Sequence, residues 1–224
     1  MPISNLSNGL RTGVCTSTNR PTTPYEGQVI YETDTDLSYI YNGSSWQQVS
    51  GGTAVGNSGL VYVTSGALST ATTNFAGCFT TTYDNYKVVI SSASISGAGD
   101  IYLRYLTTGT TPSSGSNYYW AYRGLTNAAG SADSSAAGNA YGYLGWTASG
   151  SGGAGGVSVD ILAPFLSVVT MTAGMASCLS GGTYTTRQGT IAWDASTVFT
   201  GFQVTSSGAA TLSGNVTVYG YRKA

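Results

Sequence analysis

The chain has 224 residues with 8 basic and 9 acidic side chains, and it contains no histidine. Because these charges are few and nearly cancel, there is no electrostatic footprint for nucleic acid or for an anionic membrane surface. Without histidine, neither a Ser/His/Asp nor a Cys/His catalytic arrangement can form, and the usual zinc and iron ligand sets are missing. We therefore expect no nucleic-acid partner, no cofactor and no enzymatic activity.

Residues 1–25 contain turn formers and prolines at 21 and 24, with no sustained period of 2 or 3.6 residues. This segment is predicted to be an extended arm. It lacks the basic and apolar regions of a signal peptide, and no apolar run in the chain is long enough to span a membrane. We expect synthesis in a cytoplasm without membrane insertion.

Residues 26–50 read as a small β-meander with strands at 27–33, 37–43 and 44–50. The pair Asn42-Gly43 is the strongest hairpin signal in the chain, because both residues tolerate positive φ. Isolated hairpins are marginal in water, so an apolar face of Tyr and Trp needs a partner. The predicted assembly residues are Tyr31, Tyr39, Tyr41 and Trp46.

The small, polar segment 51–59 is predicted to be a linker. Beyond it, residues 60–224 carry ten short strand patterns separated by turn signals, and no window has a helical period. The patterns lie at 60–64, 85–91, 100–107, 117–124, 140–146, 157–162, 166–173, 184–193, 199–206 and 215–221. They predict an all-β sandwich, most simply a jelly roll, with long loops at 130–139 and 149–156.

Aromatic side chains are densest at 117–123, where the sequence is NYYWAYR. Alternation along a strand sends Tyr118, Trp120 and Tyr122 to one face, which we expect to be the core face. The opposite face carries Tyr119 and Arg123. Together with Trp146 or Tyr143 from the next strand, these two would suit a sugar ring or a protein edge, since aromatics and arginine are common interface anchors.

Other polar groups favour structural roles. The cysteines at 15, 78 and 178 have no metal-binding spacing and are expected to be buried free thiols. Asp34-Thr35-Asp36 lacks the remaining ligands of a calcium loop and is predicted to be a turn. Asp160 lies in an apolar strand and is expected to pair with a cation such as Arg104 or with the edge of a strand ladder. The carboxylates needed for glycoside hydrolysis are available, but their spacing selects no pair.

The segment RPTTPYEGQVIYETDTDLSYIYNGSSWQQV, Arg20 to Val49, resembles a module near the N-terminus of many tailed-bacteriophage tail fibre and minor tail proteins. The residues that carry this resemblance are Arg20, Pro21, Pro24, Gly27, Ile30, Tyr31, Thr33, Asp34, Tyr41, Gly43 and Trp46. The stretches YDNYKVVI, YLRYLTTG and GNVTVYGYRK resemble, less specifically, the jelly-roll-like domains that follow the module. The chain has no shaft, collagen-like repeat or coiled coil, which favours a short appendage.

The resemblance implies a non-enzymatic virion structural protein, expected to be a homotrimer attached to tail, portal or capsid proteins through residues 1–50, with the sandwich facing outward. Two alternatives stay open. One is a capsid decoration or head-fibre protein, which differs only in the surface of attachment. The other is a receptor-binding module for a host surface glycan, using Tyr119, Arg123 and Trp146.

Overall fold

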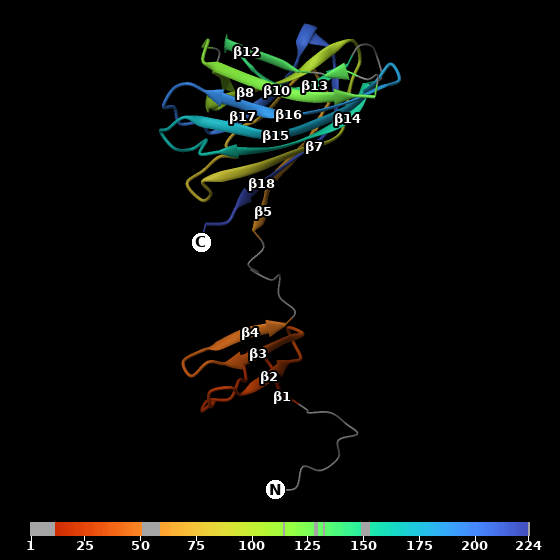
Figure 1. Cartoon of the computed structure of the whole chain (residues 1–224). Coiled ribbons are helices and arrows are strands. Elements are labelled where there is room, and N and C mark those ends of the chain that lie inside the picture. The colour runs from red at the N-terminus through yellow and green to blue at the C-terminus, as the bar shows by residue number, and fades with distance from the viewer. Residues whose placement is uncertain are drawn as a thin grey trace. The chain divides into compact units, whose positions relative to one another are not determined.

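The structure is a computed structural model that describes residues 12–50, 59–113, 115–127, 130–131, 133–148 and 153–223. The chain divides into two compact units (Figure 1). We call Met1–Ser58 the small unit and Gly59–Ala224 the sandwich unit. The boundary falls in the segment predicted as a linker, of which residues 51–58 lie outside the described residues.

The small unit is one four-stranded sheet in the order β1-β2-β3-β4. Its strands are β1 (Gly13–Cys15), β2 (Val29–Glu32), β3 (Leu37–Tyr41) and β4 (Trp46–Ser50). The predicted meander β2-β3-β4 is present and antiparallel. Asn42 Oδ1 accepts hydrogen bonds from the Ser44 and Ser45 amides in the β3–β4 turn, where Gly43 has a φ of 93°.

The described part of the predicted arm is not a free segment, because it contributes a strand to the sheet of the small unit. Residues 13–15 form β1, which runs parallel to β2 and pairs Cys15 with Glu32. An unpaired edge leaves backbone N–H and C=O groups without partners, and β1 supplies them on this side of β2. The described part of the arm therefore belongs to the small unit. Residues 1–11 lie outside the described residues.

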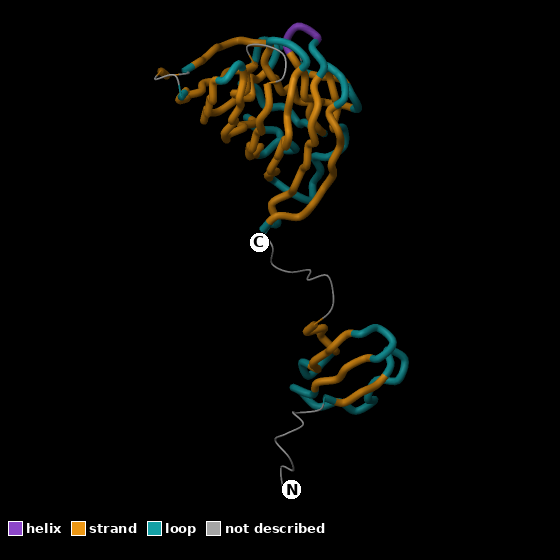
Figure 2. The backbone as a smooth tube through the Cα atoms, turned by 90° about the vertical axis from the view of Figure 1, so that its right-hand side faces the viewer, coloured by secondary structure: helices purple, strands orange, loops and turns teal. Residues whose placement is uncertain are grey.

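The sandwich unit confirms the all-β prediction, with two sheets and, among the described residues, a single 3-10 turn at Ser207–Ala209 (Figure 2). The larger sheet has the order β11-β10-β16-β15-β14-β7-β18-β5, and β12 also pairs with β10. Its strands are β5 (Leu60–Leu68), β7 (Asn85–Ile95), β10 (Tyr118–Thr126), β11 (Gly130–Ser131), β12 (Ser134–Asn139), β14 (Gly153–Leu162), β15 (Thr170–Ser180), β16 (Thr183–Trp193) and β18 (Leu212–Tyr221).

The smaller sheet has the order β13-β8-β17-β6, with β9 paired to β8. Its strands are β6 (Thr72–Phe75), β8 (Gly99–Thr108), β9 (Thr111–Pro112), β13 (Gly142–Ala148) and β17 (Gly201–Ser206). The core lies between the sheets and is rich in aromatic rings. Tyr105 stacks on Phe199 with ring centroids 4.7 Å apart, and its hydroxyl shares a 2.7 Å hydrogen bond with that of Thr172 in the larger sheet. Such fully buried side chains contribute about 1.5–3 kcal/mol each.

Each of the ten predicted strands overlaps a strand of the structure, although the one predicted at 166–173 begins four residues before β15. The two small-residue tracts are not simple loops, and residues 149–152 of the second lie outside the described residues. Residues 130–131 and 134–139 form β11 and β12, and β14 begins at Gly153. In the second tract, a glycine permits close backbone approach to the neighbouring strand β15. A Cβ atom on Gly155 would lie 1.9 Å from the Ser177 carbonyl oxygen. Such contacts explain why strand-like segments have a loop-like composition.

Candidate functional site

Strand β2 of the small unit contains the motif residue Ile30 and, outside the motif positions, Glu32. The register pairs Ile30 with Tyr39 and Glu32 with Leu37, so these four residues share one face of the sheet. Both Ile30 and Glu32 are buried. A fully buried carboxylate is costly unless it is paired.

Arg20 is the partner of that carboxylate. Its Nε donates a hydrogen bond to Glu32 Oε1, and Thr35 Oγ1 donates to Glu32 Oε2 at 2.8 Å. The guanidinium also lies over the Tyr39 ring, 4.3 Å from its centroid. The hydrogen bond from Arg20 is the largest cause of a lowered Glu32 pKa. Arg20 thus joins the segment before β2 to the face of β3.

The Asp34–Asp36 segment adopts the predicted turn and holds β1 in place. The Asp34 carboxylate accepts hydrogen bonds from the Ser17 hydroxyl at 2.6 Å and from the Ser17 amide at 2.9 Å, which lower the Asp34 pKa. The Tyr31 hydroxyl donates to Asp36 Oδ1 at 2.7 Å, and Asp36 has a φ of 55°. The carboxylates of Asp34 and Asp36 therefore both accept hydrogen bonds within the small unit.

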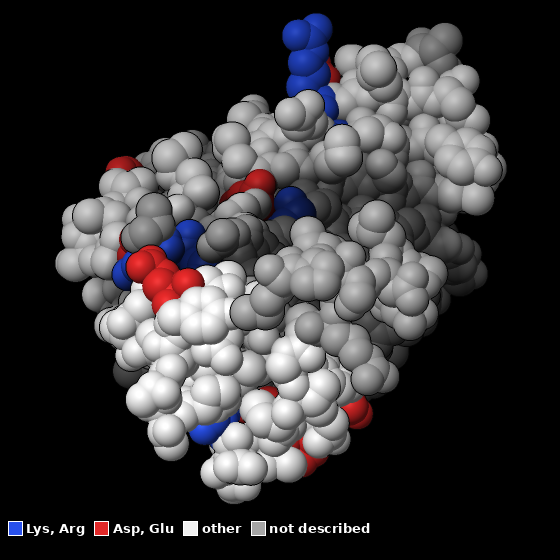
Figure 3. Space-filling view, turned by 90° about the horizontal axis from the view of Figure 1, so that it is seen from below, with Lys and Arg blue, Asp and Glu red and all other residues white. Residues whose placement is uncertain are grey.

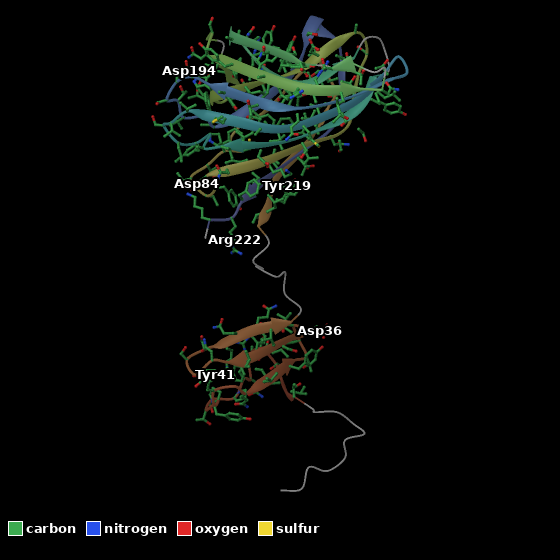
Figure 4. All side chains as sticks on the ribbon, in the orientation of Figure 1. Asp36, Tyr41, Asp84, Asp194, Tyr219 and Arg222 are labelled. Carbon is green, nitrogen blue, oxygen red and sulfur yellow. The ribbon has the colours of Figure 1, made fainter. Side chains whose placement is uncertain are left out.

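The predicted assembly residues do not share one face, which corrects the prediction of a single Tyr and Trp face. Tyr39, Tyr41 and Trp46 lie on the face of Ile30, and the Tyr41 and Trp46 rings are 5.3 Å apart. Tyr31 is paired with Ser38 and therefore points to the opposite face. Tyr41 and Asp36 lie at opposite ends of β3 (Figure 4). The three residues on the Ile30 face are half-buried within the unit.

In the sandwich unit, β10 alternates as predicted. Tyr118 and Tyr122 are buried, Trp120 is partly buried, and Tyr119 and Arg123 are exposed, Tyr119 to 41%. Arg123 lines an open depression of about 560 Å³ together with Leu125 and Met175. The described lining of this depression does not include Tyr119.

The structure does not bring the predicted glycan residues together. β13 pairs with β8 of the smaller sheet, where Trp146 is opposite Ile101, so it is not the strand next to β10. The Trp146 side chain lies outside the described residues. Tyr143 is buried between the sheets, 5.1 Å from Trp120 and 5.5 Å from Tyr122 between ring centroids. The proposed grouping of Trp146 or Tyr143 with Tyr119 and Arg123 is therefore wrong as a same-sheet site.

A different polar cleft lies where β8 and β13 meet β10, β12 and β16. It has a volume of about 160 Å³, and its described lining is Asp100, Tyr102, Trp120, Ser134, Tyr141, Tyr143 and Arg187. The Tyr102 and Tyr141 rings are stacked 4.0 Å apart, and the Tyr102 hydroxyl donates to Asp100 Oδ2 at 3.0 Å. Burial, followed by the Asp100 charge, raises the pKa of Tyr102. We call this site the aromatic cleft.

The opposite wall of the aromatic cleft carries a guanidinium and an indole. Arg187 Nη1 donates to the Tyr143 hydroxyl at 2.5 Å and contacts the Gly145 carbonyl oxygen at 3.4 Å. The Trp120 indole Nε1 is buried and has no hydrogen-bond partner among the described residues.

Sequence reasoning missed the aromatic cleft because Trp120 fits a core pattern. One signal was available in β16. Arg187 has the same parity as the buried Ile191 and Trp193, so alternation points a charged side chain inward. A charge at an inward position needs a partner or a polar site.

Two further predictions concern the partner of Asp160 and the burial of the cysteines. Asp160 pairs with Lys87 at 3.3 Å and accepts a 2.5 Å hydrogen bond from the Tyr221 hydroxyl, whereas Arg104 donates to the Ala140 carbonyl. The cation partner is therefore Lys87 rather than Arg104, because β14 pairs with β7, where Lys87 is opposite Asp160, while β8 belongs to the smaller sheet. Cys78 and Cys178 are buried thiols, but Cys15 is only half-buried on the edge strand β1.

Among the described residues, no helix is long and apolar enough to cross a membrane, and no group of three or more His, Cys, Asp or Glu could hold a metal ion. The face drawn in Figure 3 carries scattered groups of both charges. Comparison with family models, curated proteins and solved structures found no match to the chain.

Proposed function

We propose that the chain is a non-enzymatic structural protein of a tailed-phage virion. In this proposal the small unit attaches the chain to other virion proteins on the tail, portal or capsid and joins three copies. The sandwich unit faces outward. The resemblance at Arg20 to Val49 suggests the virion, and the geometry of the small unit supports attachment.

One observation carries the proposal. The residues of the resembling motif build a compact sheet with its own buried residues, separate from the sandwich unit. Arg20, Asp34 and Trp46 all contact other residues of the small unit. A module of this kind can be shared between chains with different second domains, as an attachment module requires.

The small unit also keeps apolar surface that its own fold does not cover. Val14 is 66% exposed, Tyr25 is 70% exposed and Val49 is 55% exposed. Val14 lies on β1 and Val49 on β4, so each edge strand of the sheet offers an exposed apolar side chain to a partner. Contact with a partner would also stabilise a sheet whose isolated core is marginal.

Sedimentation of the full chain beside a chain that begins at Gly59 tests the self-association. We expect a trimer for the full chain and a monomer for the shorter one, since the proposed interface lies in the small unit. A matched full-length variant with Tyr25→Ser and Val49→Ser should dissociate more readily while its sandwich unit keeps its melting temperature. Equal association states for the full and shorter chains would overturn assembly through the small unit.

The virion role has its own test. Particles of the phage that encodes the chain should contain the full-length protein, and a chain that lacks residues 1–50 should be absent from purified particles. Particles without the full-length protein, or particles that still carry the shortened one, would contradict the proposal.

A further inference from the structure

We propose that the aromatic cleft binds a single neutral sugar residue of a larger saccharide. The inference concerns the sandwich unit alone and does not rest on the proposed attachment role. The proposed sugar site is this cleft, which is lined by residues of both sheets, and not the exposed face of β10 that carries Tyr119 and Arg123. Strands β8, β10, β12, β13 and β16 each place at least one side chain in it.

The size of the cleft suits one ring. Pockets for drug-sized ligands usually have volumes of about 300–1,000 Å³. The aromatic cleft has about 160 Å³, which corresponds to roughly five waters at their volume in the liquid. It is open to the surface, so a terminal or branching residue of a chain can enter while its neighbours remain outside.

Aromatic side chains supply the smaller, apolar part of the lining, whose larger part is polar. Tyr102, Trp120, Tyr141 and Tyr143 contribute rings that do not depend on a charged ligand. A pyranose presents C–H groups on its faces, and amphipathic aromatic rings bury such surface while their hydroxyl or indole groups stay available for hydrogen bonds. A purely polar solute such as phosphate would not use these rings.

Polar groups in the lining can form hydrogen bonds with the hydroxyl groups of a sugar. The Asp100 carboxylate is an acceptor, the buried Trp120 N–H is a donor, and the Ser134 hydroxyl can serve as both. Sugar hydroxyls both donate and accept, so one ring can satisfy groups of both kinds within a small space. The Trp120 N–H is a buried donor without a partner among the described residues, so a ligand that brings an acceptor is favoured once a small side-chain shift opens this group to the cleft.

The charges in the cleft favour a neutral sugar. One carboxylate, Asp100, and one guanidinium, Arg187, line the same small volume, so their charges cancel locally. Arg187 already donates to Tyr143 and contacts the Gly145 carbonyl. An acidic sugar would gain from Arg187 but would also meet the Asp100 carboxylate, and like charges at short range are unfavourable.

The test follows the Trp120 indole N–H by two-dimensional NMR on the full chain, with Trp120→Phe used to assign its signal. The probes are glucose, galactose, mannose and N-acetylglucosamine, with glucuronate and inorganic phosphate as anionic comparisons. We expect a saturable shift of the Trp120 signal with at least one neutral sugar and a smaller or no shift with the anions.

Variants separate the cleft from the outer face of β10. Trp120→Phe keeps a ring but removes the N–H, and Asp100→Asn keeps the shape but removes the charge. Each should weaken binding of the best neutral sugar about tenfold, as the loss of one hydrogen bond predicts. Tyr119→Ala and Arg123→Ala are matched controls on the opposite face and should leave the affinity unchanged. Near-ultraviolet circular dichroism should show that all four variants are folded.

Three results would overturn the inference. The first is no saturable shift with any neutral sugar, and the second is tighter binding of glucuronate or phosphate than of every neutral sugar. The third is binding that survives Trp120→Phe and Asp100→Asn but is lost in Tyr119→Ala, which would move the site to the outer face. None of these results changes the sedimentation expected for the small unit, so the two proposals fail separately.

Discussion

Glu32 links the sequence motif to the stability of the small unit. The side chain is buried, and Arg20 and Thr35 hydrogen-bond its two carboxylate oxygens. Arg20 also stacks over Tyr39, which a lysine would not reproduce because it lacks the planar guanidinium. The motif residue Arg20 therefore forms a charged pair with Glu32, which is not itself a motif position, inside one small sheet.

This pair predicts acid sensitivity of the small unit. The pKa of Glu32 is lowered from its ordinary value of 4.5, first by Arg20, and that of Asp34 is lowered from 3.8 by Ser17. A lowered folded pKa contributes stability that is present above the ordinary pKa and is lost as pH falls through the folded value. We expect the Ile30 methyl NMR signal of the folded unit to persist at neutral pH and to weaken below about pH 4.

Glu32→Gln is the control for this prediction. It removes the main titrating group, so the variant should be less stable at neutral pH and should lose less stability on acidification. A folded Ile30 signal in the unchanged chain that stays constant down to about pH 2 would contradict the assignment of this role to the two carboxylates.

At the level of elements, β14 and β15 depend on glycine for close packing. A Cβ atom on Gly174 would lie 2.2 Å from the Ser158 carbonyl oxygen and 2.6 Å from the Val159 Cα. Both contacts are with the backbone of a paired strand, which cannot move aside as a flexible side chain can. The small-residue composition of this region is therefore a requirement of strand pairing.

Gly174→Ala should destabilise the sandwich unit by about 1–3 kcal/mol, as overpacking of a close contact does. Chemical denaturation followed by circular dichroism measures the change. Gly59→Ala is the matched control, because a Cβ atom there meets no atom within 4 Å, and it should change stability by less than about 0.5 kcal/mol. Equal stability of Gly174→Ala and the unchanged chain would show that the two strands can separate without cost.

At the level of the whole molecule, the chain has two cores of unequal size. The sandwich unit has a large cluster of buried aromatic and aliphatic residues, whereas Ile30 is the buried aliphatic residue in the described part of the small unit. Small domains bury a smaller fraction of their surface and are only marginally stable. The two units should therefore respond separately to core mutations.

Ile30→Ala should unfold the small unit and leave the sandwich unit intact. Loss of a buried isoleucine side chain down to alanine costs about 2–5 kcal/mol, which is comparable with the whole stability of so small a unit. Hydrogen exchange with mass spectrometry should show lost protection at 28–41 and unchanged protection in peptides from 59–113 and 153–223. Ile30→Val should have a much smaller effect. Lost protection in both units of Ile30→Ala would show that they fold as one.

Local patterns predicted much of the fold because they report directly on strands. The two-residue alternation at 85–91 and 117–124 located β7 and β10, and it placed Tyr118 inward and Tyr119 outward. Turn chemistry located the β3–β4 hairpin at Asn42. Residues 130–131, 134–139 and 153–156 were missed as strands, since small residues carry no alternation, and at Gly155 the small side chain is required by the backbone of another strand.

The sequence by itself determined the all-β class, the two-part organisation and the faces of individual strands, because these depend on residues close together in the chain. Only the tertiary structure decided which strands meet. It separated Trp146 from Tyr119 by placing β13 beside β8, and it gathered Asp100, Trp120 and Arg187 into one cleft. Strand order depends on how complete sheet faces pack against each other, and no local pattern records that arrangement.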